Sequence, residues 1–93
     1  MQIDNDTTLL ISRNCLMTEV DGEAVLMNID SGVYYGLDPV GTDLLKHLQQ
    51  PIQLDDLIVL LDKAYDASAT VIETDTRTLL EQLIGAGLVE RRA

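Results

Sequence analysis

The hydrophobic pattern of the chain changes its period at Asp38-Pro39, and this change limits the fold more than any other feature. Before it, short apolar runs are separated by the turn sequences Asp21-Gly22 and Ser31-Gly32, which is typical of strands. After it, apolar residues recur every three or four positions, as they do in amphipathic helices. Strands followed by helices predict an α+β domain.

The first part of the chain predicts an N-terminal three-stranded antiparallel sheet, with strands over residues 16–20, 24–29 and 33–37. Residues 9–12 are a candidate for a further extended segment. A sheet this small cannot bury its apolar face alone, so the helices must cover it. If consecutive strands pair, the third strand lies at the edge of the sheet.

The second part of the chain predicts three helices. The first begins at Asp38-Pro39, because Asp caps free N–H groups and Pro suits a first turn, and Pro51 ends it. The second begins near Leu54, and the third covers residues 71–84, where glycines stop it. The stretch YDASAT is interpreted as a loop, and the final LVE as a short strand or a docked tail. Three helices with this ending are typical of a winged helix-turn-helix unit.

The composition narrows the possible partners. The 93 residues are expected to form one domain, residues 1–93, with an aliphatic core, because the chain has no Phe or Trp. Six Lys and Arg against sixteen Asp and Glu give a formal net charge of −10. Nucleic-acid binding needs a basic face, so this charge argues against it. The acidity either steers basic peptides or basic protein surfaces to the molecule, or only keeps it soluble.

The sequence carries no signal for a membrane or for secretion. No apolar run approaches the roughly 18 residues of a membrane span. The N-terminus MQIDNDTTLL is acidic and polar, unlike a secretory signal. Cys15 is the single cysteine and cannot form an internal disulfide. We therefore expect a cytoplasmic protein without a membrane partner.

Patterns for catalysis and for metal binding are also missing. His47 and Cys15 are the single His and Cys, and they cannot form a zinc site without carboxylates. Arg13 is the only basic residue near Cys15 in sequence, and no cluster of cations stands there to lower the pKa of the thiol, so a packed thiol is expected. The stretch GLDPVG lacks the Lys-Ser/Thr ending of a phosphate-binding loop. We expect a protein that is not an enzyme and that holds no metal or cofactor.

Tyr34 and Tyr35 are neighbours on the third strand, so their side chains face opposite sides of the sheet. One is expected to bury against the helices, and the other to cover the second face or to remain exposed. The strand has no Lys or Pro, which native edge strands commonly carry against unwanted pairing. Such an edge invites an added peptide strand. Alternatively, a helix, the N-terminal segment or the C-terminal tail covers it.

Several short motifs, in their order and spacing, resemble the PqqD-like family of recognition elements for ribosomally made, modified peptides (RiPPs). The stretches VLMNIDSGVYYGLDPVGTDLLKHL, LDDLIVLLDKAYD and DTRTLLEQLIGAGLVE carry the resemblance, which spans nearly the whole chain. Asp38 and Leu45 depart from the family pattern, where Asn and an aromatic residue are frequent. The matching positions are Asp30, Gly32, Tyr34, Tyr35, Leu37, Gly41, Leu48, Tyr65, Asp66, Asp75, Leu83, Gly87 and Leu88.

The resemblance implies a domain that binds the leader region of a precursor peptide. The leader would add as a strand beside the third strand and lie against the third helix. The third helix could present either of two flanks to the leader. The first flank carries Asp75, and the second contains Arg77, Leu80 and Ile84. Leu79 and Leu80 fit the core better than a groove. The candidate binding residues are Val33, Tyr34, Tyr35 and Gly36 on the strand, and Asp75, Thr78, Leu79 and Gln82 on the first flank.

The resemblance also implies partners. A free-standing domain of this length is similar to the leader-binding proteins of lasso-peptide biosynthesis, whose partners are the precursor, a leader peptidase and an ATP-dependent cyclase. The same fold also stands alone beside radical-SAM enzymes, as in pyrroloquinoline quinone biosynthesis. Two other interpretations stay open. One is a DNA-binding winged helix, although its recognition helix would carry Arg77 alone against acidic residues. The other is an adaptor that dimerises through its edge strand.

Overall fold

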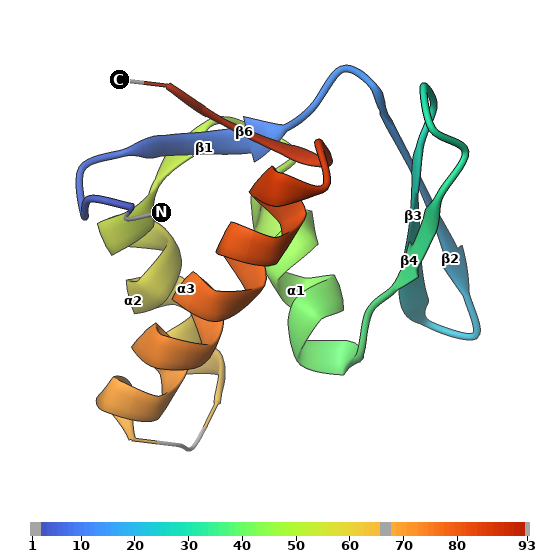
Figure 1. The fold of residues 1–93 in the computed structure, drawn as a ribbon. Helices are drawn as coiled ribbons and strands as arrows, with labels where there is room; N and C mark the ends of the chain where they lie inside the picture. Colours follow the sequence, from blue (N-terminus) through green and yellow to red (C-terminus); the bar gives the residue numbers. More distant parts are fainter. Residues whose placement is uncertain (1–2, 66–67, 93) are drawn as a thin grey trace.

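The computed structural model describes residues 3–65 and 68–92, and it has two small sheets beside a helical body, one above the helices and the other at their right in Figure 1. Asp66 and Ala67, in the predicted loop, lie outside the described residues. The elements in chain order are β1 (Thr8–Ile11), β2 (Cys15–Val20), β3 (Glu23–Asn28), β4 (Tyr34–Gly36), α1 (Pro39–His47), β5 (Ile52–Gln53), α2 (Leu54–Ala64), α3 (Ala69–Gly85) and β6 (Val89–Arg92).

The predicted N-terminal sheet is present, with strand order β2-β3-β4 and antiparallel pairing throughout. Asp21 and Gly22 form the tight turn between β2 and β3, and both have positive φ, at 54° and 83°. This is the backbone that an Asp-Gly hairpin turn requires. The α+β prediction, with this sheet followed by three helices, is therefore confirmed.

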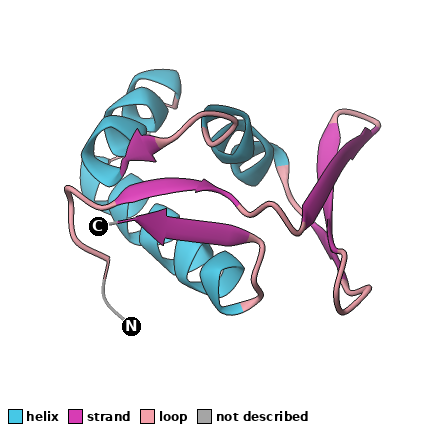
Figure 2. Cartoon of the chain, turned by 90° about the horizontal axis from the view of Figure 1, so that it is seen from above, coloured by secondary structure: helices cyan, strands magenta, loops and turns pink. Residues whose placement is uncertain are grey.

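A second sheet, with strand order β5-β1-β6, lies over the helices in the view of Figure 2, whereas the first sheet stands at the right of that view. β1 pairs with β6 from Thr8 opposite Arg92 to Ile11 opposite Val89, so the two ends of the chain lie side by side. The candidate extended segment at residues 9–12 is thus a strand, and the LVE stretch leads into another. The three helices with this sheet resemble a winged helix-turn-helix unit.

The core lies between the two sheets and the helices, and it is almost entirely leucine. Because the chain has no Phe or Trp, many small aliphatic side chains must fill the interior. Ile3 of the N-terminal segment and Val89 of β6 close the core at the second sheet. The fully buried leucines are Leu9, Leu26, Leu44, Leu45, Leu48, Leu54, Leu57, Leu61, Leu80, Leu83 and Leu88.

Two helix boundaries differ from the prediction. The first helix ends at His47 rather than at Pro51, because the Leu48 carbonyl oxygen accepts from the Ile11 N–H group at 3.3 Å and the chain then runs on to pair with β1. The third helix begins at Ala69 rather than at residue 71, because the Ser68 hydroxyl accepts a hydrogen bond from the Val71 N–H group at 3.2 Å. A serine at this position satisfies one of the free N–H groups of the first turn.

Candidate functional site

β4 is an edge strand, as the sequence predicted. It pairs with β3 alone, with Tyr35 opposite Leu26, and no other strand among the described residues pairs with its second side. β2 forms the opposite edge of the same sheet. The two edges differ in what lies beside them, because residues of β4 and of the last turns of α3 line one hollow, which no residue of β2 lines.

The pairing fixes which backbone groups of β4 face outward. The Leu37 N–H group donates to the Ala24 carbonyl oxygen at 2.9 Å, and the Val33 carbonyl oxygen accepts from the Asn28 N–H group at 3.0 Å. Successive residues of a strand direct these groups to alternate sides. Tyr35 therefore pairs with β3, whereas Tyr34 and Gly36 direct their N–H and C=O groups to the open edge.

The two tyrosines face opposite sides of the sheet, but neither is buried. Tyr34 is 68% exposed on the side away from the helices, as one of the expected outcomes had it. Tyr35 faces the helices and is still 37% exposed, so the expectation of a buried tyrosine is wrong. The helices pack on Ala24 and Leu26 of the central strand, and they leave open space in front of β4.

This open space is a groove between β4 and α3. One hollow of about 440 Å³ lies beside Tyr35 and the last turns of α3. A second, of about 630 Å³, continues between the start of α1 and α3 as far as Tyr65 and Val71. Gly36, Leu37, Leu79 and Gln82 line both hollows, so they form one continuous groove.

The rotation of α3 decides which flank faces this groove. Asp75, Thr78, Leu79 and Gln82 all line it. On the other flank, Leu80 is fully buried, Ile84 packs on the core and the Arg77 guanidinium donates to the Ile3 carbonyl oxygen and the Asn5 side chain. Leu80 is core, as expected, whereas Leu79 both packs on the core and lines the groove.

Hydrogen bonds hold β4 and α1 in place at the groove. The Asp38 carboxylate accepts from the Gly41 N–H group at 2.8 Å and caps α1 directly after β4. The buried Thr42 hydroxyl accepts from the Ala24 N–H group at 2.8 Å and ties α1 to the central strand. A Cβ on Gly41 would lie 3.3 Å from Leu79, so glycine here allows α1 to approach α3 closely.

The groove is acidic and has no free cation on α3. Asp38 and Asp75 line it, and both are exposed. At its far end the Tyr65 hydroxyl donates to the Asp43 carboxylate, and this bond raises the pKa of Tyr65 to about 12. Arg77, the single cation of α3, is bound to Glu73 at 3.3 Å as well as to the N-terminal segment.

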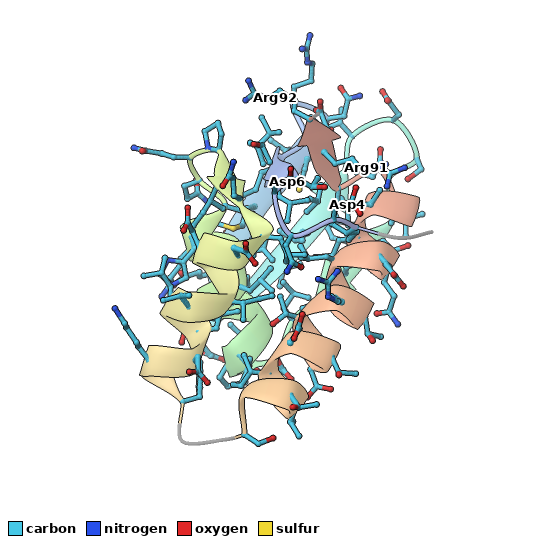
Figure 3. The ribbon with its side chains drawn as sticks, turned by 90° about the vertical axis from the view of Figure 1, so that its left-hand side faces the viewer. Asp4, Asp6, Arg91 and Arg92 are labelled. Atoms are coloured by element: carbon cyan, nitrogen blue, oxygen red, sulfur yellow. The ribbon has the colours of Figure 1, made fainter. Side chains whose placement is uncertain are left out.

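The remaining cationic side chains do not gather into one basic face. Arg91 and Arg92 of β6 lie at the end of the molecule where Asp4 and Asp6 of the N-terminal segment also lie (Figure 3). Lys46 of α1 lies 3.7 Å from Glu19 of β2. A nucleic-acid interface needs clustered cations, and this distribution does not provide them.

The surroundings of Cys15 and His47 fit packing and helix-end positions rather than a reactive site. Cys15 is partly buried in β2 against the core, and burial raises the pKa of its thiol. His47 is the last residue of α1, where the helix dipole favours a cation. Among residues 3–65 and 68–92, no group of three His, Cys, Asp or Glu side chains is placed to hold a metal ion. No helix of this part of the chain is long and apolar enough to cross a membrane.

Several groove residues were not recognised in the sequence. Leu37, Val40, Tyr65 and Val71 are among those that line the larger hollow. Tyr65 continues the helical spacing of the buried leucines of α2, which is typical of a core residue, and it does pack against the core. Val40 and Val71 are apolar yet substantially exposed. Val71 lies outside the buried stripe of its helix, and this was the signal that could have revealed it. Val40 has the spacing of the apolar stripe of its helix, so no such signal marked it.

The sequence and the fold identify the family. Residues 23–89 match the family described as coenzyme PQQ synthesis protein D (PqqD). This match covers well over half of the chain, and the chain therefore belongs to the PqqD family, as its motifs indicated. Among curated proteins, none matches the chain.

Two solved structures have a similar fold. TbiB1 in complex with the TbiA(beta) leader peptide is 27% identical with a TM-score of 0.82, covering 90% of this chain and 98% of that one. A lasso peptide synthetase B1 complexed with the leader peptide is 22% identical with a TM-score of 0.72, covering 88% of this chain and 96% of that one. The second similarity extends to the fold alone.

Proposed function

We propose that this protein binds the leader region of a ribosomally made precursor peptide at β4 and presents it to processing enzymes. The observation that carries the proposal is the open edge of β4 beside the α3 groove. Its outward N–H and C=O groups, at Tyr34 and Gly36, are free to pair with an added strand. The similarity to TbiB1, which is described in complex with a leader peptide, supports the same function here.

In this proposal, backbone pairing supplies affinity and the groove supplies specificity. A strand added beside Val33, Tyr34, Tyr35 and Gly36 would direct alternate side chains toward α3. Those side chains would meet Leu79 and the polar groups of Asp75, Thr78 and Gln82. The acidic residues of the groove favour a leader that carries Lys or Arg.

The protein would act by recognition and not by making or breaking bonds. We infer that its partners are a leader peptidase and an ATP-dependent cyclase of the lasso-peptide type, in a cytoplasmic pathway. A radical-SAM enzyme is the alternative partner within the same family of functions. The genes beside this one distinguish the two, because a lasso pathway encodes a short precursor and a peptidase.

A titration of a fluorescently labelled leader tests the proposal. We expect saturable binding with micromolar or tighter affinity, which corresponds to roughly −8 kcal/mol or better. Fluorescence anisotropy measures it on the full chain. If no precursor encoded nearby binds saturably, the proposed function is wrong.

DNA binding is not favoured as a second function. The helix that would enter the groove of DNA carries Glu73, Asp75 and Glu81, and its single Arg77 is already bound to protein groups. Phosphate would be repelled by this surface. Dimerisation through β4 is a separate alternative, and a leader that competes with self-association would reveal it.

A further inference from the structure

The last turn of α3 contains a glycine that the end of the helix does not require. Gly85 is the final helical residue, and α3 terminates through Gly87, which has a positive φ of 75°. The Gly87 N–H group donates to the Ile84 carbonyl oxygen at 3.0 Å. The Leu88 N–H group donates to the Leu83 carbonyl oxygen at 2.9 Å. A left-handed glycine with such bonds commonly ends a helix, whereas Gly85 keeps a helical backbone that other residues also adopt.

Packing does not require a glycine at this position either. A Cβ on Gly85 would have no packing partner within 4 Å, whereas a Cβ on Gly87 would lie 2.9 Å from the Asn28 amide nitrogen. Glycine lowers the stability of a helix relative to alanine, because it loses more conformational freedom on folding. Gly85 therefore destabilises α3 without a structural reason, and departures of this kind are expected at functional sites.

Gly85 lines the smaller hollow of the groove, which has a volume of about 440 Å³ and lies beside Tyr35. Residues three or four positions apart share one face of a helix, so Gly85 continues the flank of Thr78 and Gln82. The side chains of both residues line the groove. A side chain at position 85 would therefore project into the smaller hollow, and its absence keeps that hollow open.

The walls of this hollow determine what fits into it. Tyr35, Leu79 and Ala86 present apolar surface, and Gln82 supplies a polar group. Gly36, whose N–H and C=O groups face the open edge of β4, also lines the hollow. A strand added at this edge would direct alternate side chains toward α3. A large apolar side chain would bury the apolar walls, whereas a charged side chain would lose its hydration against them.

We propose that Gly85 determines specificity: its missing side chain admits one large apolar side chain of the leader into the hollow between Tyr35 and the last turn of α3. This inference rests on the proposed function, since the leader supplies the occupant. It adds that the leader carries a Leu, Ile, Met or aromatic residue at the position that faces Gly85. It also separates affinity from stability, because the residue that admits the leader side chain weakens the helix.

The test uses Gly85→Ala and Gly85→Leu, with Ala64→Leu as the matched control. Ala64 is likewise an exposed, small, final residue of a helix, in α2, and it lines neither hollow of the groove. Each protein is titrated with the labelled leader encoded nearby by fluorescence anisotropy. The titrations are repeated with leader variants in which one large apolar residue at a time is replaced by alanine. Urea denaturation gives the midpoint of unfolding of each protein.

We expect Gly85→Leu to weaken binding of the unaltered leader by about tenfold or more, because the added side chain fills the hollow. Gly85→Ala should weaken it less, and Ala64→Leu should stay within about twofold of wild type. The urea midpoint of Gly85→Ala should rise, since alanine favours the helix. One truncated leader should bind Gly85→Leu at least as tightly as it binds wild type, because the two changes compensate in volume.

Three results would overturn the inference while leaving leader binding intact. The first is that Gly85→Leu and Ala64→Leu bind the unaltered leader equally well. The second is that Gly85→Leu weakens every leader variant by the same factor, because the glycine would then serve a close approach of the leader backbone. The third is a lower urea midpoint for Gly85→Ala, which would give the glycine a structural role. If wild type itself binds no leader, the proposed function is contradicted instead.

Discussion

The side-chain amide of Asn28 donates a hydrogen bond to the Ala86 carbonyl oxygen at 2.9 Å, and this bond joins the end of β3 to the end of α3. The carboxamide oxygen of the same residue accepts from the N–H groups of Asp30 at 2.9 Å and Ser31 at 3.3 Å. One side chain therefore shapes the turn that leads into β4 and fixes that turn to the helix across the groove. A Cβ on Gly87 would lie 2.9 Å from this amide nitrogen, and Gly87 also has a positive φ of 75°.

Replacing Asn28 should remove the hydrogen bonds that hold the turn before β4 against the end of α3. We expect Asn28→Ala to lower the free energy of unfolding by about 1–3 kcal/mol, because it removes these hydrogen bonds and leaves their partners unsatisfied. Urea denaturation measures the change. Asn14→Ala is the matched control, since no side-chain hydrogen bond is assigned to Asn14, and it should stay within about 0.5 kcal/mol of wild type. Equal stability of the two variants would show that the Asn28 bonds do not hold the turn.

The acidic flank of α3 should contribute to leader affinity through charge. Asp75 is exposed and lines the groove, so Asp75→Lys should weaken binding of a basic leader by about 1 kcal/mol. Asp62→Lys on α2 changes the net charge equally, away from the groove residues, and is the control. Anisotropy titrations at low and at physiological salt should show the difference shrinking with salt. If both variants weaken binding equally, only the overall charge matters and the leader does not contact this flank of α3.

The Tyr65–Asp43 hydrogen bond should make the free energy of unfolding decrease at alkaline pH. The folded-state pKa of Tyr65 is raised to about 12, above the value near 10 of an unfolded tyrosine. The stabilisation is then complete below pH 10 and is lost as the pH rises toward 12, where the unfolded chain ionises first. The stability advantage of wild type over Tyr65→Phe should therefore be constant from about pH 7 to 9 and shrink above pH 10. Denaturation at several pH values measures it, and an advantage that stays constant through this range would rule out the bond.

The edge strand could be predicted because it follows from local rules. Asp21-Gly22 fixes the first hairpin, and the helix start at Asp38-Pro39 leaves no residues for a fourth strand beside β4. The resemblance to the PqqD-like family then pointed to α3, but the flank of Asp75 could not be chosen over the flank of Arg77, because the sequence does not fix the rotation of the helix. The same local signals explain why the α+β class was clear from the sequence.

The second sheet and the exposure of Tyr35 could not be predicted, because both depend on distant contacts. β1 and β6 pair across almost the whole length of the chain, and β5 has only two residues, too few for a periodic signal. Tyr35 remains exposed because the helices pack on Leu26 of the neighbouring strand. Strand alternation predicts which face a side chain takes, but not how closely another layer approaches it.

Proline substitutions on the N-terminal sheet separate leader docking from folding. Tyr34 directs its N–H group to the open edge, whereas Tyr35 pairs with Leu26, so each proline removes a different hydrogen bond. Tyr35→Pro should break the ladder between β3 and β4 and destabilise the domain. Glu19→Pro is the matched control, because by the same alternation Glu19 directs its N–H group to the outer edge of β2.

The leader affinity of Tyr34→Pro, measured by fluorescence anisotropy beside circular dichroism, tests the central claim most directly. We predict that Tyr34→Pro stays folded and loses leader affinity by on the order of tenfold to 100-fold, since a leader carbonyl group would lose its partner. Glu19→Pro should also stay folded and bind the leader as wild type does. If folded Tyr34→Pro binds with wild-type affinity, the leader does not dock on β4, and the account of this edge is wrong.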